Sequence, residues 1–159
     1  MIRITRQSDY GIVLVSHMAA HPERSFGAPE LAAQVNLPLP IVRKILKLLA
    51  REGLLVSQRG VKGGYCLALP PEVISVADVV TALEGPIALT ECIEDAPGGG
   101  CAHEAVCPLM PKWQRINAVI QQALSGISLS ELIAPWPREL PVLSRAARPV
   151  PAAVQTPLR

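Results

Sequence analysis

Three cysteines lie within one short stretch in the second half of the chain, TECIEDAPGGGCAHEAVC, at positions 92, 101 and 107. Thiolates are soft ligands, and in proteins they hold iron–sulfur clusters or zinc. Zinc sites usually show paired C-x-x-C spacings, which Cys92, Cys101 and Cys107 lack. The three consecutive glycines before Cys101 would let the backbone wrap closely around a bulky inorganic core. The pattern therefore favours ligation over a loop of free thiols.

Three thiolates leave a tetrahedral set one ligand short, so the loop needs a further donor. His103 lies in the loop itself, but it is only two residues from Cys101. Both side chains reaching one small core would strain the backbone between them. The remaining cysteine, Cys66, lies in a β-prone run before the loop, and we expect it to fill space in the core.

A second set of residues with distinct chemistry is basic. Arg43, Lys44 and Lys47 lie in one predicted helix, and Arg59 and Lys62 lie at a glycine-rich turn. A helix in the major groove can direct such side chains at phosphates and guanine edges, and a basic hairpin beside it can add contacts. The alternative is a solvated basic face that mediates protein contacts. We interpret the five residues as DNA-binding.

The charge distribution along the chain favours the same interpretation. Residues 1–65 contain nine Lys and Arg but four Asp and Glu, whereas residues 66–111 contain seven Asp and Glu and no Lys or Arg. A basic N-terminal half suits a polyanionic partner, and the acidic middle segment cannot be the surface that meets phosphates.

The first predicted element is a helix over residues 8–21. Ser8 or Asp9 can begin it by accepting backbone N–H bonds, and Pro22 ends it. A second helix is predicted near 29–35, because proline is tolerated in a first helical turn. The apolar face of the first helix comprises Ile12, Leu14, Val15 and Met18.

A third helix, over about 39–52, follows a tight break at Asn36-Leu37-Pro38 and carries basic residues. Beyond Gly53, two β-prone runs, 54–58 and 65–69, enclose a tip with three glycines, which suit a tight hairpin. Two short helices, a longer basic helix and a basic hairpin, in this order, predict a winged helix-turn-helix. The expected apolar face of the third helix comprises Ile41, Ile45, Leu48 and Leu49.

The second half of the chain is predicted to be helical on both sides of the cysteines. Ser75 caps a helix over 76–84, and Pro108 and Pro111 mark the start of a long helix that runs to about Leu124. Apolar residues in and after the long helix recur at near-heptad spacing, which is typical of a helix that pairs with a partner helix. They are Trp113, Ile116, Ile120, Ala123 and Ile127.

The predicted fold is mainly α with a small β-wing: a winged helix-turn-helix plus a long C-terminal dimerisation helix. Residues 1–71 form the DNA-binding region, with the helix-turn-helix at about 28–52 and the wing at 54–69. Residues 72–134 carry the cluster-binding loop, the dimerisation helix and a last helical turn at 129–133. Residues 135–159 contain six prolines and little periodicity, and we expect a disordered tail.

The sequence also argues against other classes of protein. No nucleophile–base pair, phosphate-binding loop or paired carboxylate site stands out, so no enzyme is predicted. No apolar run is long enough to cross a bilayer, and the N-terminus does not resemble a signal peptide. We expect a cytoplasmic protein, in which the four cysteines are reduced thiols or metal ligands rather than disulfides.

Several short motifs occur together over about residues 1–134, and the three-cysteine loop lies among them. They are Ile4-Thr5, Ser8-Asp9-Tyr10-Gly11, Leu31-Ala32, Leu37-Pro38-Leu39-Pro40, Arg59-Gly60, Gly63-Gly64-Tyr65, Trp113 and Ser128-Leu129. With them the chain resembles the Rrf-two superfamily of IscR- and NsrR-like winged-helix regulators. The run LEGPIALTEC, residues 83–92, looks closest to the subgroup that regulates the SUF iron–sulfur assembly operon.

The resemblance implies a homodimer on a palindromic operator, and an iron–sulfur cluster, 2Fe–2S or 4Fe–4S, held by the three cysteines and one other ligand. IscR-like relatives carry a histidine shortly after the third cysteine, where this chain has Met110. In other relatives an acid at the place of Asp9 ligates across the dimer. We therefore predict the partner subunit's Asp9 as the fourth ligand, with His103 as the alternative. A helix N-cap is the other role open to Asp9.

The residues and the resemblance together predict an iron–sulfur-containing repressor of the iron–sulfur cluster assembly (SUF) genes. Two alternatives remain open. One is a nitric-oxide- or redox-responsive regulator of the same fold, with the same cysteines and different target genes. The other is a zinc-stabilised protein-interaction module that binds no DNA.

Overall fold

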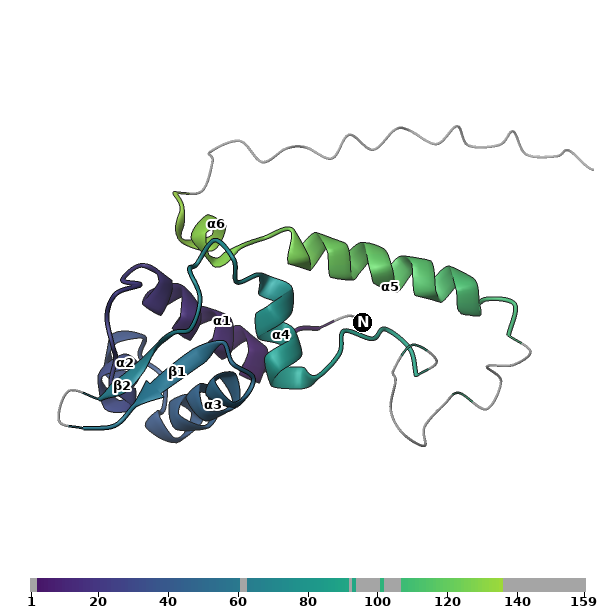
Figure 1. Cartoon of the computed structure of the whole chain (residues 1–159). Helices are drawn as coiled ribbons and strands as arrows, with labels where there is room; N and C mark the ends of the chain where they lie inside the picture. The colour runs from purple at the N-terminus through teal and green to yellow at the C-terminus, as the bar shows by residue number, and fades with distance from the viewer. Residues whose placement is uncertain (1–2, 61–62, 92, 94–100, 102–106, 136–159) are drawn as a thin grey trace, which may run out of the picture.

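The computed structural model describes residues 3–60, 63–91, 93, 101 and 107–135 (Figure 1). Its elements, in chain order, are α1 (Arg6–Ala19), α2 (Ala28–Gln34), α3 (Leu39–Arg51), β1 (Leu55–Gln58), β2 (Gly64–Leu67), α4 (Val76–Glu84), α5 (Met110–Ser125) and α6 (Leu129–Ile133). Helices α1–α4 and the β1–β2 hairpin gather into one body, here called the N-terminal unit, and α5 extends past it. The mainly helical fold with a small two-stranded sheet agrees with the predicted fold class.

Helix α1 begins at Arg6, earlier than predicted. Thr5 is its N-cap, with φ −70° and ψ 161°, and the Thr5 hydroxyl accepts a bond from Ser8 N over 3.3 Å. A cap residue lies just outside the helix, whereas Ser8 and Asp9 lie within the first turns of α1. The predicted cap at Ser8 or Asp9 is therefore wrong.

Helices α2 and α3 form the helix-turn-helix, and the turn lies at the predicted break. Asn36 has a positive φ of 52°, a conformation that asparagine adopts more readily than most residues. Leu37 packs half-buried against the core, and its N–H donates to Ala32 O over 3.0 Å. The turn thereby sets the direction in which α3 leaves α2.

Helix α3 has one buried face. Val42, Ile45, Leu46 and Leu49 are all fully buried, at the i, i+3, i+4, i+7 spacing of a helical stripe. The prediction that Ile41 belongs to this face is wrong, because Ile41 is 38% exposed. Position 41 lies about 100° around the helix from Val42, at the edge of the stripe. Leu48, also predicted there, is half-buried against the core.

The wing is an antiparallel hairpin of β1 and β2, as predicted. Its Cα partners are Leu55–Leu67, Val56–Cys66, Ser57–Tyr65 and Gln58–Gly64. Val61 and Lys62, at the tip, lie outside the described residues. The chain before α2 joins β2 on its other side, because Phe26 and Tyr65 exchange two backbone hydrogen bonds of 2.9 Å each.

Helix α4 crosses α1 at very short range. A Cβ on Gly11 would lie 2.2 Å from Leu83 Cδ1, so a larger residue there would require the Leu83 side chain to shift. Ser75 caps α4 as predicted, in a capping box with Asp78. One core joins the residues on both sides of position 71. It includes Leu14, Val15, Met18, Phe26, Leu31, the buried face of α3, Ile74, Val79, Leu83 and Leu129.

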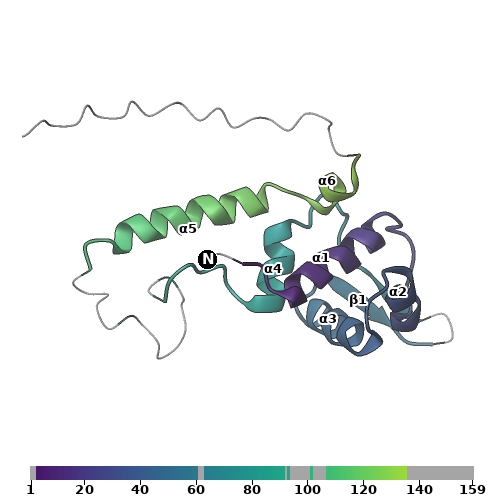
Figure 2. The same cartoon turned by 180° about the vertical axis from the view of Figure 1, so that it is seen from behind.

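After α5 the chain returns to the N-terminal unit. Val76 N donates to Ile127 O and Leu129 N donates to Ile74 O, each over 2.9 Å. These bonds fasten α6, which Ser128 caps in a capping box with Glu131, beside the start of α4. Figure 2 shows that α5 extends away from the N-terminal unit. None of the described helices is long and apolar enough to span a membrane.

Candidate functional site

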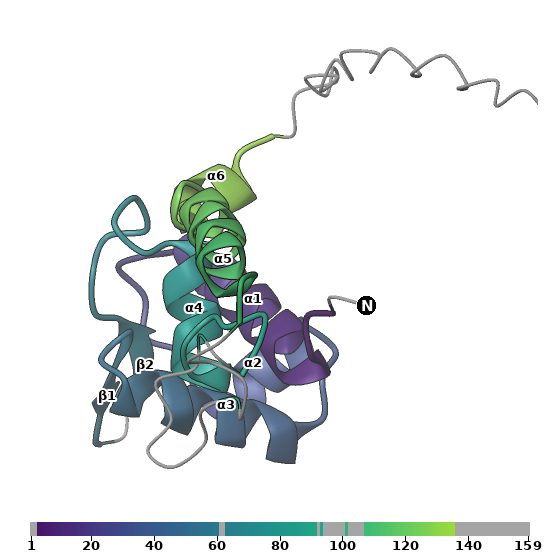
Figure 3. The ribbon, with the colours of Figure 1, turned by 90° about the vertical axis from the view of Figure 1, so that its right-hand side faces the viewer.

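The basic surface is formed by α3 and the wing. Arg43, Lys44 and Lys47 are exposed on the side of α3 opposite its buried face, and Arg59 is exposed directly after β1. Lys62, predicted to act with them, lies outside the described residues. Figure 3 shows α3 and the hairpin at one end of the molecule and α5 and α6 at the other.

No acid pairs with these basic side chains in the described part of the chain. The two ion pairs there join Arg24 to Glu30 and Arg51 to Glu52. The exposed cations of α3 and the wing are therefore available to a ligand. Several unpaired cations on one surface suit a polyphosphate backbone, since phosphate contacts supply most of the electrostatic affinity for DNA.

Two apolar residues extend this surface. Pro40 and Ile41 are both exposed at the N-terminal end of α3. In a helix-turn-helix the N-terminal residues of the second helix contact base edges, where an apolar side chain can meet a thymine methyl group. Ile41 was expected in the core, whereas the structure leaves it exposed beside the basic residues of α3. The i, i+3, i+4, i+7 spacing of Val42 with the other buried residues of α3 could have indicated that Ile41 lies outside the buried face.

The cysteine loop, residues 90–107, connects α4 to α5. Cys101 and Cys107 are half-buried free thiols, and the carbonyl of Cys107 accepts a bond from Met110 N over 3.4 Å. Cys92 and His103 lie outside the described residues. Among the residues that are described, no three His, Cys, Asp or Glu side chains gather into a set that could hold a metal ion. The complete ligand set therefore stays a prediction.

Cys66 is separate from this loop. It lies on β2, and its Sγ is 3.9 Å from Val56 O on β1. The side chain is half-buried rather than enclosed in the core. Cys66 is not part of the hydrophobic core, so the expectation that it fills space there is wrong.

Asp9 lies near the start of α1 with its side chain exposed. Because Thr5 is the cap of this helix, N-capping is not the role of Asp9. Neither ion pair of the described residues involves it. The carboxylate is therefore open to a group on another molecule.

A hydrogen-bond network joins the start of α1 to the end of α4. Glu84 accepts from Ser8 Oγ over 2.8 Å and also from Thr5 Oγ1, and Gln7 Nε2 donates to Leu83 O over 2.8 Å. Ser8 is fully buried, so its hydroxyl needs such a partner. No local pattern indicates this network, because Ser8 and Glu84 lie 76 positions apart in the chain. The network ties α1 to the segment that leads into the cysteine loop.

The outer face of α5, defined here by Trp113, Ile116 and Val119, is apolar and uncovered. The exposed fractions are 38%, 44% and 58%, respectively. Apolar residues that neighbour one another on a surface commonly mark an interaction site. Trp113 and Ile116 belong to the predicted dimerisation stripe, whereas Ile120 of that stripe is half-buried and lines a pocket with Ile87 and Leu89. The dimer itself stays a prediction.

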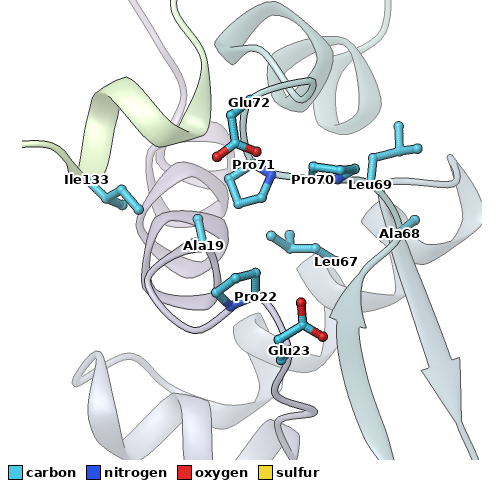
Figure 4. A pocket seen from close by; sticks show the side chains of 10 residues that line it. All are labelled: Ala19, Pro22, Glu23, Leu67, Ala68, Leu69, Pro70, Pro71, Glu72 and Ile133. Atoms are coloured by element: carbon cyan, nitrogen blue, oxygen red, sulfur yellow. The ribbon is translucent and has the colours of Figure 1, made fainter.

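A pocket of about 440 Å³ lies between the end of α1, the segment after β2 and α6 (Figure 4). Its charged side chains are Glu23 and Glu72, and its walls are apolar residues such as Leu67, Pro71 and Ile133. No cysteine, histidine, serine or lysine lines it. The pocket contains none of the predicted DNA-binding or metal-ligating residues.

Comparisons with known proteins agree with this architecture. The Rrf2 family model, described as iron-dependent transcriptional regulator, matches residues 4–135. Protein aau3 of Rhizobium meliloti is 33% identical over 125 residues, which cover 79% of this chain and 76% of that protein. The HTH-type transcriptional regulator IscR of Aliivibrio salmonicida is 26% identical over 133 residues, which cover 83% and 77%.

Among solved structures, the global cysteine regulator CymR of Bacillus subtilis matches with a TM-score of 0.63 and 28% identity. The match covers 84% of this chain and 97% of CymR. IscR and CymR are transcriptional regulators rather than enzymes, which agrees with the expectation from the sequence.

Proposed function

Because the chain belongs to the Rrf2 family of transcriptional regulators, we propose that it is an iron–sulfur-containing repressor of the iron–sulfur cluster assembly (SUF) genes. The observation that carries this proposal is an open basic surface on α3 and the wing, in a chain that also has a three-cysteine loop. The basic surface reads DNA, and the loop senses iron or redox state.

In the proposed complex, α3 enters the major groove and the wing lies along the adjacent backbone. Arg43, Lys44 and Lys47 project from the exposed side of α3, where they meet base edges and phosphates. Arg59 and Lys62 would contact phosphates beside the groove. A regulator that reads the chromosome works where the DNA is, so the cytoplasmic location is part of the proposal.

A homodimer on a palindromic operator follows from the same reasoning. A two-fold dimer presents two copies of α3, and each copy reads one half-site. The outer face of α5 supplies apolar area for the contact between subunits. The distance between the two copies of α3 then depends on how α5 sits against each N-terminal unit.

The thiols of the loop suit an iron–sulfur cluster by their chemistry. Cys101 and Cys107 are free and half-buried, so they are available as ligands yet partly shielded from water. Soft thiolates are the usual ligands of such clusters, and Cys92 would be the third. A bound cluster, 2Fe–2S or 4Fe–4S, would supply the sensitivity to iron and oxidation that the side chains alone lack.

We assign the fourth ligand to the partner subunit's Asp9, with His103 as the alternative. Asp9 is exposed, and the start of α1 is bonded to the end of α4 through Glu84. A carboxylate is a hard and weak ligand beside thiolates, so its bond would open first. Opening would change the balance between two arrangements of the DNA-reading units.

Anaerobic purification and operator binding test the proposal together. The protein should be brown, with visible absorption bands, and should bind DNA from a SUF promoter. Cys92→Ala, Cys101→Ala and Cys107→Ala should each remove the colour, whereas Cys66→Ala, the control on β2, should keep it. Loss of colour in Cys66→Ala, with one of the other three unaffected, would show that the ligand set is wrong.

The alternatives predict different outcomes of the same experiment. A coloured protein that binds other promoters and ignores the SUF promoter would support a nitric-oxide- or redox-responsive regulator. A colourless, zinc-loaded protein without affinity for DNA would support a protein-interaction module.

A further inference from the structure

Asn117 is the buried residue of α5, with 6% of its surface exposed. Asparagine forms helices less readily than the leucine or alanine that could fill this place. A buried amide is also unfavourable unless both of its polar groups find partners. Its presence inside the contact between α5 and the rest of the chain therefore calls for a specific role.

Both polar groups of the Asn117 amide bond to one short segment of backbone. Nδ2 donates to Ile87 O over 2.8 Å, and Oδ1 accepts from Leu89 N over 3.1 Å. The two partners flank Ala88, so one side chain fixes the main chain on both sides of a single residue. An apolar side chain of similar volume could pack there but could not fix the backbone in this way.

The fixed segment leads directly into the cysteine loop. Leu89 precedes Cys92 by three residues, and Cys107 precedes Met110, the first residue of α5, by three residues. Asn117 therefore holds the segment that enters the cysteine loop against α5, the helix that follows the loop. Holding both ends of a loop lowers the entropy lost when its side chains converge on one ligand.

The same segment is also joined to the N-terminal unit. Ile87 and Leu89 line one pocket of about 210 Å³ together with Ser8 and Glu84, which link α1 to α4, and with Ile120 of α5. The start of α1, the end of α4 and α5 therefore meet around the backbone that Asn117 bonds.

We propose that Asn117 is a positioning residue for the cluster: its two hydrogen bonds hold residues 87–89, which lead into the cysteine loop, against α5, which follows the loop. This inference rests on the proposed function, since it needs a cluster in the loop. Asn117 itself does not ligate the cluster. Residues that orient metal ligands in this way typically change metal affinity about 10–100-fold when they are replaced.

Two substitutions separate positioning from packing. Asn117→Leu removes both hydrogen bonds and keeps the volume, and Asn117→Asp keeps the acceptor for Leu89 N but replaces the donor to Ile87 O. Gln114→Glu is the matched control, because it makes the same change from amide to acid at an exposed position of α5. Each protein is prepared anaerobically as the full chain.

The measurements are iron content, the visible circular-dichroism spectrum and the rate of cluster loss to a chelator. Both Asn117 variants are expected to lose the cluster roughly 10–100-fold faster than the unsubstituted chain and Gln114→Glu, with an altered spectrum. Far-ultraviolet circular dichroism and operator binding by the cluster-free proteins should be unchanged. If Asn117→Leu does not fold, the rate of cluster loss from Asn117→Asp tests the positioning role, because this variant preserves the size of the side chain and one of its two hydrogen bonds.

Unchanged spectra and loss rates in the variants, with a brown unsubstituted protein, would overturn the role of Asn117 alone. A colourless unsubstituted protein would overturn the proposed function and this inference with it. Equal acceleration of cluster loss by Gln114→Glu would show a general effect of charge on α5 and would also overturn the inference.

Discussion

At one position of the wing, the absence of a side chain decides how the backbone packs. A Cβ on Gly64 would lie 2.5 Å from the carbonyl oxygen of Phe26 and 2.7 Å from its carbonyl carbon. Both are backbone atoms, so neither can rotate out of the way. The contact allows Phe26 to pair with Tyr65, and this pairing fixes β2 to the chain before α2.

Gly64→Ala should therefore weaken both the fold and DNA binding. Overpacking at such a contact typically lowers the free energy of unfolding by about 1–3 kcal/mol. Urea denaturation measures this change, and operator titration measures the effect on the wing. Gly126→Ala is the control, because a Cβ there would lie 3.4 Å from its nearest neighbour, Gln122 O, and the backbone is already helical. That control should be neutral or stabilising by about 0.4–1 kcal/mol; equal effects of the two substitutions would contradict the steric argument.

Asp9 permits a test of ligation without interference from helix capping, since Thr5 is the cap. Asp9→Asn removes the charge and keeps the shape. If Asp9 ligates the cluster, the variant should show a shifted visible spectrum and faster cluster loss, while the cluster-free form binds DNA normally. Glu23→Gln, an exposed carboxylate just beyond the other end of α1, is the control. A variant with an unaltered spectrum and unaltered lability would reject Asp9, and His103→Ala would be the next variant to make.

At the scale of elements, α3 gains its function from two faces with opposite properties. The buried face attaches the helix to α1 and α2, and the exposed side carries Arg43, Lys44, Lys47 and Arg51. Arg51 bonds Glu52 through its Nε over 2.8 Å, so the three residues nearer the middle of the helix are the ones without an ion pair, and the proposed function assigns these three to DNA. The wing lies at the same end of the molecule and adds Arg59.

Replacing one of these cations should change how DNA binding depends on salt. For Arg43→Ala, loss of a phosphate contact should reduce the slope of log affinity against log salt by about one. Loss of a contact to a base should instead cost about 1–3 kcal/mol and relax one operator position. Lys112→Ala, on α5 at the opposite end of the molecule, should leave the slope unchanged. An unchanged affinity and slope for Arg43→Ala would remove this residue from the DNA surface.

The sequence predicted the elements well because each of them has a local signal. Apolar spacing and helix-ending residues indicated α1 and α3, and the predicted Ser75 cap of α4 matched the structure. What it missed depends on contacts between distant segments. The Phe26–Tyr65 pairing and the bonds of Asn117 to residues 87–89 join parts of the chain that no short motif relates. For the candidate site, the basic face of α3 was predictable, whereas Asn117 looked like one more polar residue of α5.

At the scale of the whole molecule, the basic surface lies on α3 and the wing, and the uncovered apolar face lies on α5. The N-terminal unit and α6 are packed into one core, but the outer face of α5 is open in the single chain. A dimer contact through this face would leave both basic surfaces free, because α5 and α3 lie at opposite ends.

Ile116→Glu should therefore convert the dimer into monomers at micromolar concentration. The side chain is 44% exposed in the single chain, so the substitution should not disturb the fold, but a dimer would bury an unpaired charge. Sedimentation measures the mass, and circular dichroism checks the helix. Ile120 is less suitable because it lines the pocket with Ile87 and Leu89. Val73→Glu, at a site 62% exposed and outside α5, should remain dimeric; an Ile116→Glu protein that sediments as a dimer would show that the interface lies elsewhere.

The return of α6 to the N-terminal unit has a consequence for how the chain is made. Ribosomes synthesise the N-terminus first, so α3 and the wing emerge before the cysteine loop. Leu129, however, is fully buried in the core that α1 and α3 share, and removing a leucine from such a core typically costs about 2–5 kcal/mol. The nascent chain therefore cannot complete its core until the loop and α5 have also been translated. A product terminated before the cysteine loop would contain α3 and the wing without the loop and α5, and its incomplete core would expose it to proteolysis before it could occupy an operator permanently.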